Sequence, residues 1–271
     1  MEEKILKGTE KGLLMLLISL IMTLGGTGMI VYGGVNDIPL LAFAGSVIIT
    51  LGVILVIGVK VVRPQEAVVY TLFGKYIGTL KEEGFHYINP FATSFNPASN
   101  TKLGQSGDVK SSTVKDADMG KKISLKAMTL SNSKQKVNDV LGNPVEVGVA
   151  VIWRVVDTAA AVFNVDNFKE YLSLQCDTAV RDIVKLYPYD VAPDIDTTGD
   201  GIADDGSLRG STTIVAERIK NLIQEKVNIA GLEIIEARIT YLAYAPEIAS
   251  AMLQRQQANA IIDARKVIVE G

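Results

Sequence analysis

The chain has 271 residues, of which 48% are hydrophobic and 21% are charged, and its formal net charge is −3. This charge offers no basic surface for nucleic acid, which is therefore excluded as a partner. The single cysteine, Cys176, cannot form an intrachain disulfide, and the single histidine, His86, leaves little material for metal ligation or histidine-based catalysis. Composition thus weighs against an enzyme, and the sequence predicts no cofactor.

The first sixty residues account for the high mean hydropathy of the chain, which is +0.26. No charge interrupts the run from Leu13 to Val35, and a second uncharged run extends from Pro39 to Val59. Each run reaches the roughly 20 residues that a helix needs to cross the hydrocarbon core of a membrane. Because the connection through Asp37 is so short, we expect an antiparallel transmembrane hairpin over residues 13–59.

Two alternatives apply to this region. A cleaved signal peptide usually has an apolar core of only about 7 to 15 residues, and no A-x-A-like cleavage site precedes a mature start here. A re-entrant hairpin that dips into one leaflet would give the same final topology as a spanning one.

Basic residues predict the side of the membrane on which the hairpin ends lie. They flank its outer ends at Lys4, Lys7, Lys11, Lys60 and Arg63, and none lies in the connecting loop. Because Lys and Arg favour the cytoplasmic side, both ends are expected there. The sequence therefore predicts an integral protein of the plasma membrane whose following domain is cytoplasmic.

Small residues at helical spacing are candidate helix-packing faces, within one hairpin or between neighbouring copies, because they let backbones approach closely. They are Thr23, Thr27, Ala42, Ser46 and Thr50. The alternative is that small residues only reflect the usual composition of membrane helices.

Strands are predicted after the hairpin. A β-branched and aromatic run covers 67–72, followed by a tight turn and a second strand that opens at Gly84. The clearest strand covers 145–155, where Val and Trp alternate with other residues so that one face is apolar. Its expected hairpin partner is the run that ends at Val137.

The pattern then changes to helical spacing. An apolar stripe consists of Phe168, Leu172, Cys176, Ala179, Ile183 and Leu186, so Cys176 is expected to face a core. A second helix is predicted from Thr212 to about Ile229, with Val215, Ile219, Leu222 and Ile223 buried, and Gly231 ends it. A last strand is predicted where Ile235, Ala237, Ile239 and Tyr241 alternate with Glu236, Arg238 and Thr240. This order of strands and helices predicts an α+β domain.

A final helix is predicted to begin at Pro246, a residue favoured in the first helical turn, and to run to about Val269. Its apolar line is thin, through Ile248, Met252 and Ile262. So polar a helix is expected to project as an arm that packs on copies of itself or on a partner, as the possible start of a coiled coil. No C-cap precedes Gly271, which leaves open a longer native arm.

Several motifs, in order, resemble the SPFH, or band 7, family of stomatin, prohibitin, flotillin and the HflK/HflC pair. They are Arg63-Pro64-Gln65-Glu66-Ala67-Val68-Val69, Phe73-Gly74-Lys75-Tyr76, Gly84-Phe85-His86-Tyr87-Ile88-Asn89-Pro90-Phe91, Val137-Asn138-Asp139, Gly142-Asn143-Pro144-Val145, Trp153-Arg154-Val155, Tyr187-Pro188-Tyr189-Asp190 and Ala245-Pro246-Glu247-Ile248-Ala249. The resemblance covers about residues 61–271 and implies an SPFH α+β domain (61–245) and a helical arm (246–271). With the cytoplasmic N-terminal segment (1–12) and the transmembrane hairpin (13–59) predicted above, the chain has four parts.

What the resemblance implies about function is a non-enzymatic scaffold that binds membrane lipids, assembles as a large homo-oligomer and organises a membrane microdomain. An alternative is an accessory regulator of a membrane-bound ATP-dependent protease. A distant alternative is an integral membrane hydrolase. The chain has no G-x-S-x-G, G-x-x-x-x-G-K or H-E-x-x-H motif, although a Ser-Lys dyad needs none of these.

One acidic segment has the residue pattern of a calcium loop. Asp196, Thr198 and Asp200 alternate as oxygen ligands do, and Gly201 stands sixth. The twelfth position is Ser207, where a bidentate carboxylate would be needed. A solvated acidic loop is therefore the favoured interpretation, and no metal site is predicted.

Overall fold

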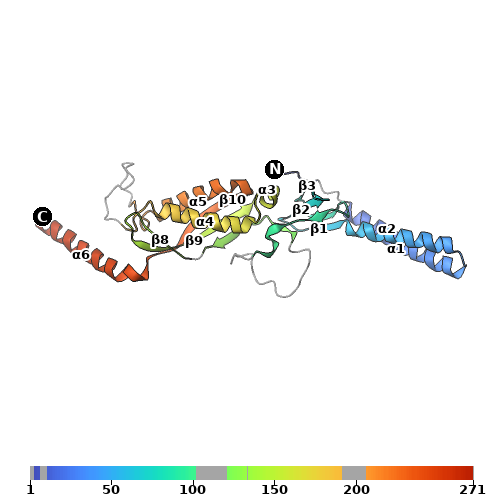
Figure 1. The fold of residues 1–271 in the computed structure, drawn as a ribbon, viewed down its shortest axis with the longest axis horizontal. Helices are drawn as coiled ribbons and strands as arrows, with labels where there is room; N and C mark the ends of the chain where they lie inside the picture. The colour runs from blue at the N-terminus through green and yellow to red at the C-terminus, as the bar shows by residue number, and fades with distance from the viewer. Residues whose placement is uncertain (1–2, 7–10, 102–120, 133, 191–205, 271) are drawn as a thin grey trace.

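A computed structural model describes residues 3–6, 11–101, 121–132, 134–190 and 206–270. The molecule is elongated, with a helical hairpin at one end, a single helix at the other and the β-sheets between them (Figure 1). The observed architecture is α+β, as the sequence predicted.

The hairpin consists of α1 (Gly12–Val35) and α2 (Pro39–Ile57), and both helices are long and apolar enough to cross a membrane. Pro39 occupies the first turn of α2, where its missing N–H leaves no intrahelical hydrogen bond unmade. Only 11% of the most apolar stretch of each helix is buried, so neither is the core helix of a globular domain. One residue, Gly58, separates α2 from strand β1 (Val59–Val62).

A small sheet follows the hairpin. Its central strand is β2 (Glu66–Leu72). Three strands pair with β2, all antiparallel to it: β3 (Lys75–Leu80), β5 (Thr93–Ser94) and β6 (Ile123–Ser124). We call it the proximal sheet. The strand predicted from Gly84 is β4 (Gly84–Tyr87), and it pairs with β1. A short 3-10 helix, η1 (Pro97–Asn100), follows β5.

A second sheet, called here the distal sheet, holds the main core. Its strands are β7 (Met128–Ser131), β8 (Gln135–Asn138), β9 (Pro144–Val155) and β10 (Leu232–Tyr244). The long strand β9 pairs with β10 on one side and with both β7 and β8 on the other. The predicted hairpin of β8 and β9 is confirmed, and all six alternating Val and Trp positions of β9 are buried. This sheet packs against α4 (Phe168–Val184) and α5 (Thr212–Val227). Two short helices complete the domain, α3 (Thr158–Phe163) and η3 (Asn228–Ala230).

The last predicted strand is confirmed as β10, but three residues of the apolar patterns in the sequence are exposed. In β10, Ile235 and Tyr241 are 40% and 36% exposed, whereas Leu232, Ile234 and Ala237 are buried. The register shifts after Ile234 and after Ile239, and each bulge reverses which side chains face the core. Leu186 is 64% exposed because α4 ends at Val184, so helical spacing no longer orients it.

The final helix is α6 (Pro246–Glu270), and it begins where the sequence predicted. It extends away from the domain, at the end opposite the hairpin (Figure 1). Among its described side chains, Leu253, Ile261 and Ile262 are exposed.

Candidate functional site

The seam between α1 and α2 is built from the smallest residues of the hairpin. Its buried positions are Ser19, Gly26 and Gly33 in α1 and Gly45 and Gly52 in α2. Within each helix these residues recur every seven positions, which keeps one narrow face toward the partner over several turns. The two backbones therefore meet along a continuous line.

The contact distances show how close this approach is. A Cβ atom at Gly26 would lie 2.8 Å from the Gly45 carbonyl oxygen, and one at Gly45 would lie 2.7 Å from the Gly26 carbonyl oxygen. The Ser19 hydroxyl donates a hydrogen bond of 2.9 Å to the Gly52 carbonyl across the seam. A larger residue at Gly26 or Gly45 would therefore push the two backbones apart.

The five predicted packing residues divide into two groups. Thr23 and Ala42 are half-buried beside the seam, next to Gly52 and Gly33 respectively. The others, Thr27, Ser46 and Thr50, are exposed on the outside of the hairpin. Their hydroxyls donate hydrogen bonds to carbonyl oxygens of their own helices.

The seam glycines recur in the sequence every seven residues, and a search at four-residue spacing misses this pattern. The prediction followed hydroxyl and alanine residues at intervals of four, whereas the seam uses Gly and Ser at intervals of seven. A search for the smallest residues at coiled-coil spacing would have found it.

The open end of the hairpin is seated against β4. A Cβ atom at Gly12 would lie 2.7 Å from the backbone carbonyl of Phe85, and one at Gly58 would lie 2.5 Å from the carbonyl oxygen of Ile88. The Ile88 N–H also donates a 2.9 Å hydrogen bond to the Gly58 carbonyl. Both helix ends thus contact the same strand and the residue that follows it.

The base of the arm brings together motifs that are far apart in the sequence. The buried Asp139 carboxylate accepts hydrogen bonds from the backbone N–H groups of Leu141, Asn143 and Tyr189. The Tyr189 ring packs on that of Tyr244, with centroids 3.9 Å apart. One residue later, the Ala245 N–H donates to the Pro144 carbonyl at 2.9 Å, so the start of α6 is held in place.

The two tyrosines of this cluster titrate above their ordinary range. Burial is the main reason that the pKa of Tyr189 and the pKa of Tyr244 are raised, because it disfavours the charged phenolate. Both hydroxyls are therefore neutral at physiological pH.

The remaining candidate residues have no partner for catalysis in the described part of the chain. Cys176 is buried in the core, as predicted, and desolvation, with a smaller effect of the Asp177 charge, raises the pKa of its thiol to about 12. His86 is buried in β4, with Nε2 2.9 Å from the Glu82 carbonyl oxygen. Among the described residues, no three His, Cys, Asp or Glu side chains lie close enough together to hold a metal ion. The calcium-like positions Asp196, Thr198 and Asp200 lie outside the described residues.

Comparison with known families gives one match. The sequence model described as SPFH domain / Band 7 family matches residues 60–271, which covers both sheets and the arm but not the hairpin. A comparison with curated proteins finds no match.

Proposed function

Because the chain belongs to the SPFH/Band 7 family, we propose that it is a non-enzymatic membrane scaffold that assembles from many copies and organises a membrane patch or its resident proteins. The observation that carries this proposal is the separation of two surfaces. The exposed apolar hairpin lies at one end of the molecule and the exposed arm at the other (Figure 1). A membrane contact and a contact between copies can therefore form at the same time.

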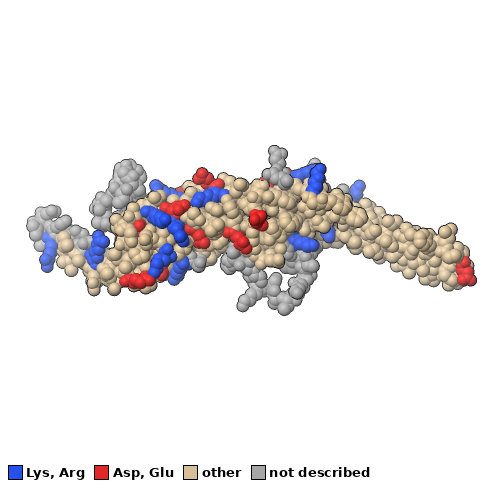
Figure 2. All heavy atoms as spheres, in the orientation of Figure 1, with Lys and Arg blue, Asp and Glu red and all other residues tan. Residues whose placement is uncertain are grey.

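The hairpin supports the membrane contact. Its shaft shows no charged side chain on the face drawn in Figure 2, and an acidic group lies only at the tip. Lipid can cover its exposed leucines and isoleucines, which water would not stabilise. At the base, the Tyr87 ring lies against Gly58, and Phe85 is exposed beside the start of α1. Aromatic residues at this level are typical of a membrane–water interface.

The proposed sidedness rests on the same geometry. Both outer ends of the hairpin lie at the domain, since α1 begins and α2 ends against β4 and its continuation. Lys11 precedes α1 and Lys60 follows α2, and the preference of basic residues for the cytoplasm supports a domain on the cytoplasmic side, which we propose is that of the plasma membrane.

The arm supports self-assembly. A single polar helix with exposed Leu253, Ile261 and Ile262 gains little by projecting alone into water, but neighbouring arms can cover these side chains. The outward Thr27, Ser46 and Thr50 of the hairpin are proposed as a second contact between copies.

Size measurement tests the proposal. Full-length protein extracted in mild detergent is expected to form a large, homogeneous assembly by light scattering and electron microscopy. Replacing Leu253, Ile261 and Ile262 together by Ser is expected to reduce its size, whereas Leu174→Ser, at an exposed position of α4, serves as the control. A wild-type particle containing a single chain would contradict the proposal. Copurification of a membrane-bound ATP-dependent protease would instead favour the regulator.

A further inference from the structure

The segment that precedes the hairpin pairs with the proximal sheet through one parallel β-bridge. Residues 3–6 run parallel to β3, with Ile5 opposite Thr79. The Thr79 N–H donates to the Lys4 carbonyl, and the Leu6 N–H donates to the Thr79 carbonyl, both at 2.8 Å. Because β3 pairs with β2 on its other side, this segment occupies the outer edge of β3.

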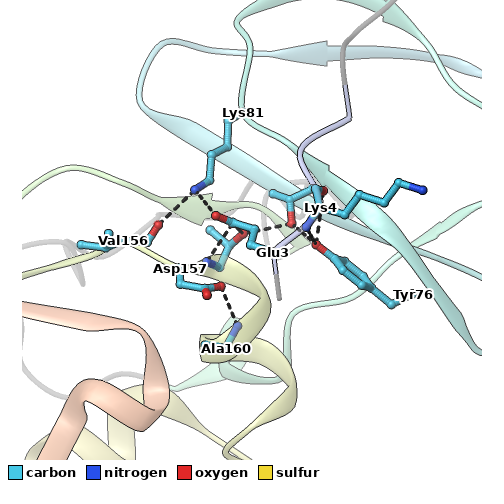
Figure 3. A network of polar contacts seen from close by, with 9 residues as sticks. Glu3, Lys4, Tyr76, Lys81, Val156, Asp157 and Ala160 are labelled. Atoms are coloured by element: carbon cyan, nitrogen blue, oxygen red, sulfur yellow. Dashed lines mark hydrogen bonds and ion pairs between the residues drawn. The ribbon is translucent and has the colours of Figure 1, made fainter. Parts of the chain in front are cut away.

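A polar network anchors the segment at Glu3 (Figure 3). Its carboxylate accepts hydrogen bonds from the Thr158 N–H at 3.0 Å and from the Thr158 hydroxyl, and it pairs with the Lys81 ammonium at 2.6 Å. Lys81 also donates to the Val156 carbonyl at 3.0 Å. The Glu3 side chain is only 14% exposed, so solvent screens this pair less than a surface ion pair.

Hydroxyl groups continue the network into the interior. The Thr158 hydroxyl lies 3.0 Å from that of Thr79, which lies 3.0 Å from the Tyr76 hydroxyl. Thr79 and Thr158 are fully buried. The Lys4 N–H donates to the Tyr76 hydroxyl at 3.3 Å, which returns the network to the N-terminal segment.

The network lies where the two sheets meet, beside the hydrophobic core that they share. Tyr76 and Thr79 belong to β3 of the proximal sheet, whereas Val156 and Thr158 follow β9 of the distal sheet. Glu3 lies between them, and it precedes α1 along the chain. One carboxylate therefore contacts both sheets and belongs to the segment that leads into the membrane helices.

We propose that residues 3–6 form a clasp that holds the hairpin, the proximal sheet and the distal sheet as one rigid unit, with Glu3 as its positioning residue. The two ends of the hairpin already rest against β4 at Gly12 and Gly58, and the clasp adds an attachment on β3. This further attachment limits tilting of the hairpin relative to the domain. This role does not depend on assembly, so it stands apart from the scaffold proposal.

Hydrogen–deuterium exchange of the full-length protein in detergent tests the clasp. Glu3→Ala removes the acceptor for Thr158 and leaves Lys81 without its buried counter-ion. Within residues 76–81 and 156–160, the Thr79 and Thr158 amides are expected to exchange about tenfold faster, because these two donate to the Lys4 carbonyl and the Glu3 carboxylate. Glu83→Ala, at an exposed carboxylate in the same turn as Lys81, is the matched control and is expected to leave both segments unchanged.

Glu3→Gln separates hydrogen bonding from charge. The amide oxygen can still accept from Thr158, but the ion pair with Lys81 is lost, so the exchange of residues 156–160 is expected to rise less than in Glu3→Ala. If Glu3→Ala does not yield folded protein, Glu3→Gln alone serves as the test of the clasp. Unchanged exchange at both segments in Glu3→Gln would then overturn the proposal, as it would in Glu3→Ala.

Distance measurements test rigidity directly. Spin labels at Asn36→Cys in the hairpin loop and Leu174→Cys on α4, in a Cys176→Ala background, are expected to give one narrow distance distribution. Adding Glu3→Ala is expected to broaden it. Equal widths with and without Glu3 would contradict the clasp even if exchange had changed.

Discussion

The hairpin and the distal sheet use apolar residues in opposite ways. In the hairpin, glycine and serine fill the seam while leucine, isoleucine and phenylalanine point outward. In the distal sheet, Trp153 and the valines of β9 point inward against α4. Burial of large side chains stabilises the sheet by removing apolar surface from water, whereas the hairpin is held by close backbone approach.

This difference identifies the surroundings that each region requires. A seam of glycines buries little apolar area. In water, it would not prevent the exposed apolar faces of the two helices from associating with other molecules. The same seam suffices where lipid covers the outer faces. The sheet needs no such cover, because its helices α4 and α5 already bury its apolar face.

The largest predicted effect lies in the distal sheet. Trp153 is fully buried, and its ring meets that of Phe168 edge to face at 6.2 Å. Trp153→Ala is expected to lower the free energy of unfolding by about 3–5 kcal/mol, through lost burial and the cavity left behind. Urea unfolding in detergent measures this change. Leu174→Ala, at an exposed position of α4, is expected to change it by less than about 0.5 kcal/mol.

A smaller loss of stability is predicted in the hairpin. It depends on which face of α1 receives the larger side chain, and not on the added volume alone. Gly26→Leu places a side chain within 2.8 Å of the Gly45 carbonyl and is expected to destabilise the helix pair by about 1–3 kcal/mol. Gly28→Leu adds the same side chain to the same helix where no atom lies within 4 Å.

Disulfide formation reports on the seam. Thr23→Cys with Gly52→Cys places two thiols across it, and oxidation is expected to link them efficiently in the Gly28→Leu background but poorly with Gly26→Leu. Equal yields in both backgrounds would show that the glycine seam does not hold the helices together.

The smallest predicted effect is a dependence of stability on pH. Burial raises the pKa of Cys176 from 9.0 to about 12, so the unfolded chain releases the thiol proton first as pH rises. The stability contributed by the neutral thiol is complete below pH 9.0 and is lost progressively above it. Comparing wild type with Cys176→Ala at about pH 8 and about pH 10 isolates this group, and parallel pH profiles would contradict the prediction.

The predictable parts of the fold are those that local pattern decides. Alternation in β9 and the helical stripe through Leu172 and Cys176 each give the correct buried face. The turn at Asp37 and the helix start at Pro246 follow from residues whose backbone preferences act locally.

Only the tertiary structure decided which small residues meet and where the N-terminal segment lies. Composition by itself determined that two apolar helices precede an α+β domain, because long uncharged runs and strand alternation are properties of neighbouring residues. The bulges of β10, the seven-residue seam and the contact of Glu3 with Thr158 depend on partners 33 to 155 residues apart or on a neighbouring strand. Such contacts form only when the elements have packed, so no short stretch of sequence specifies them.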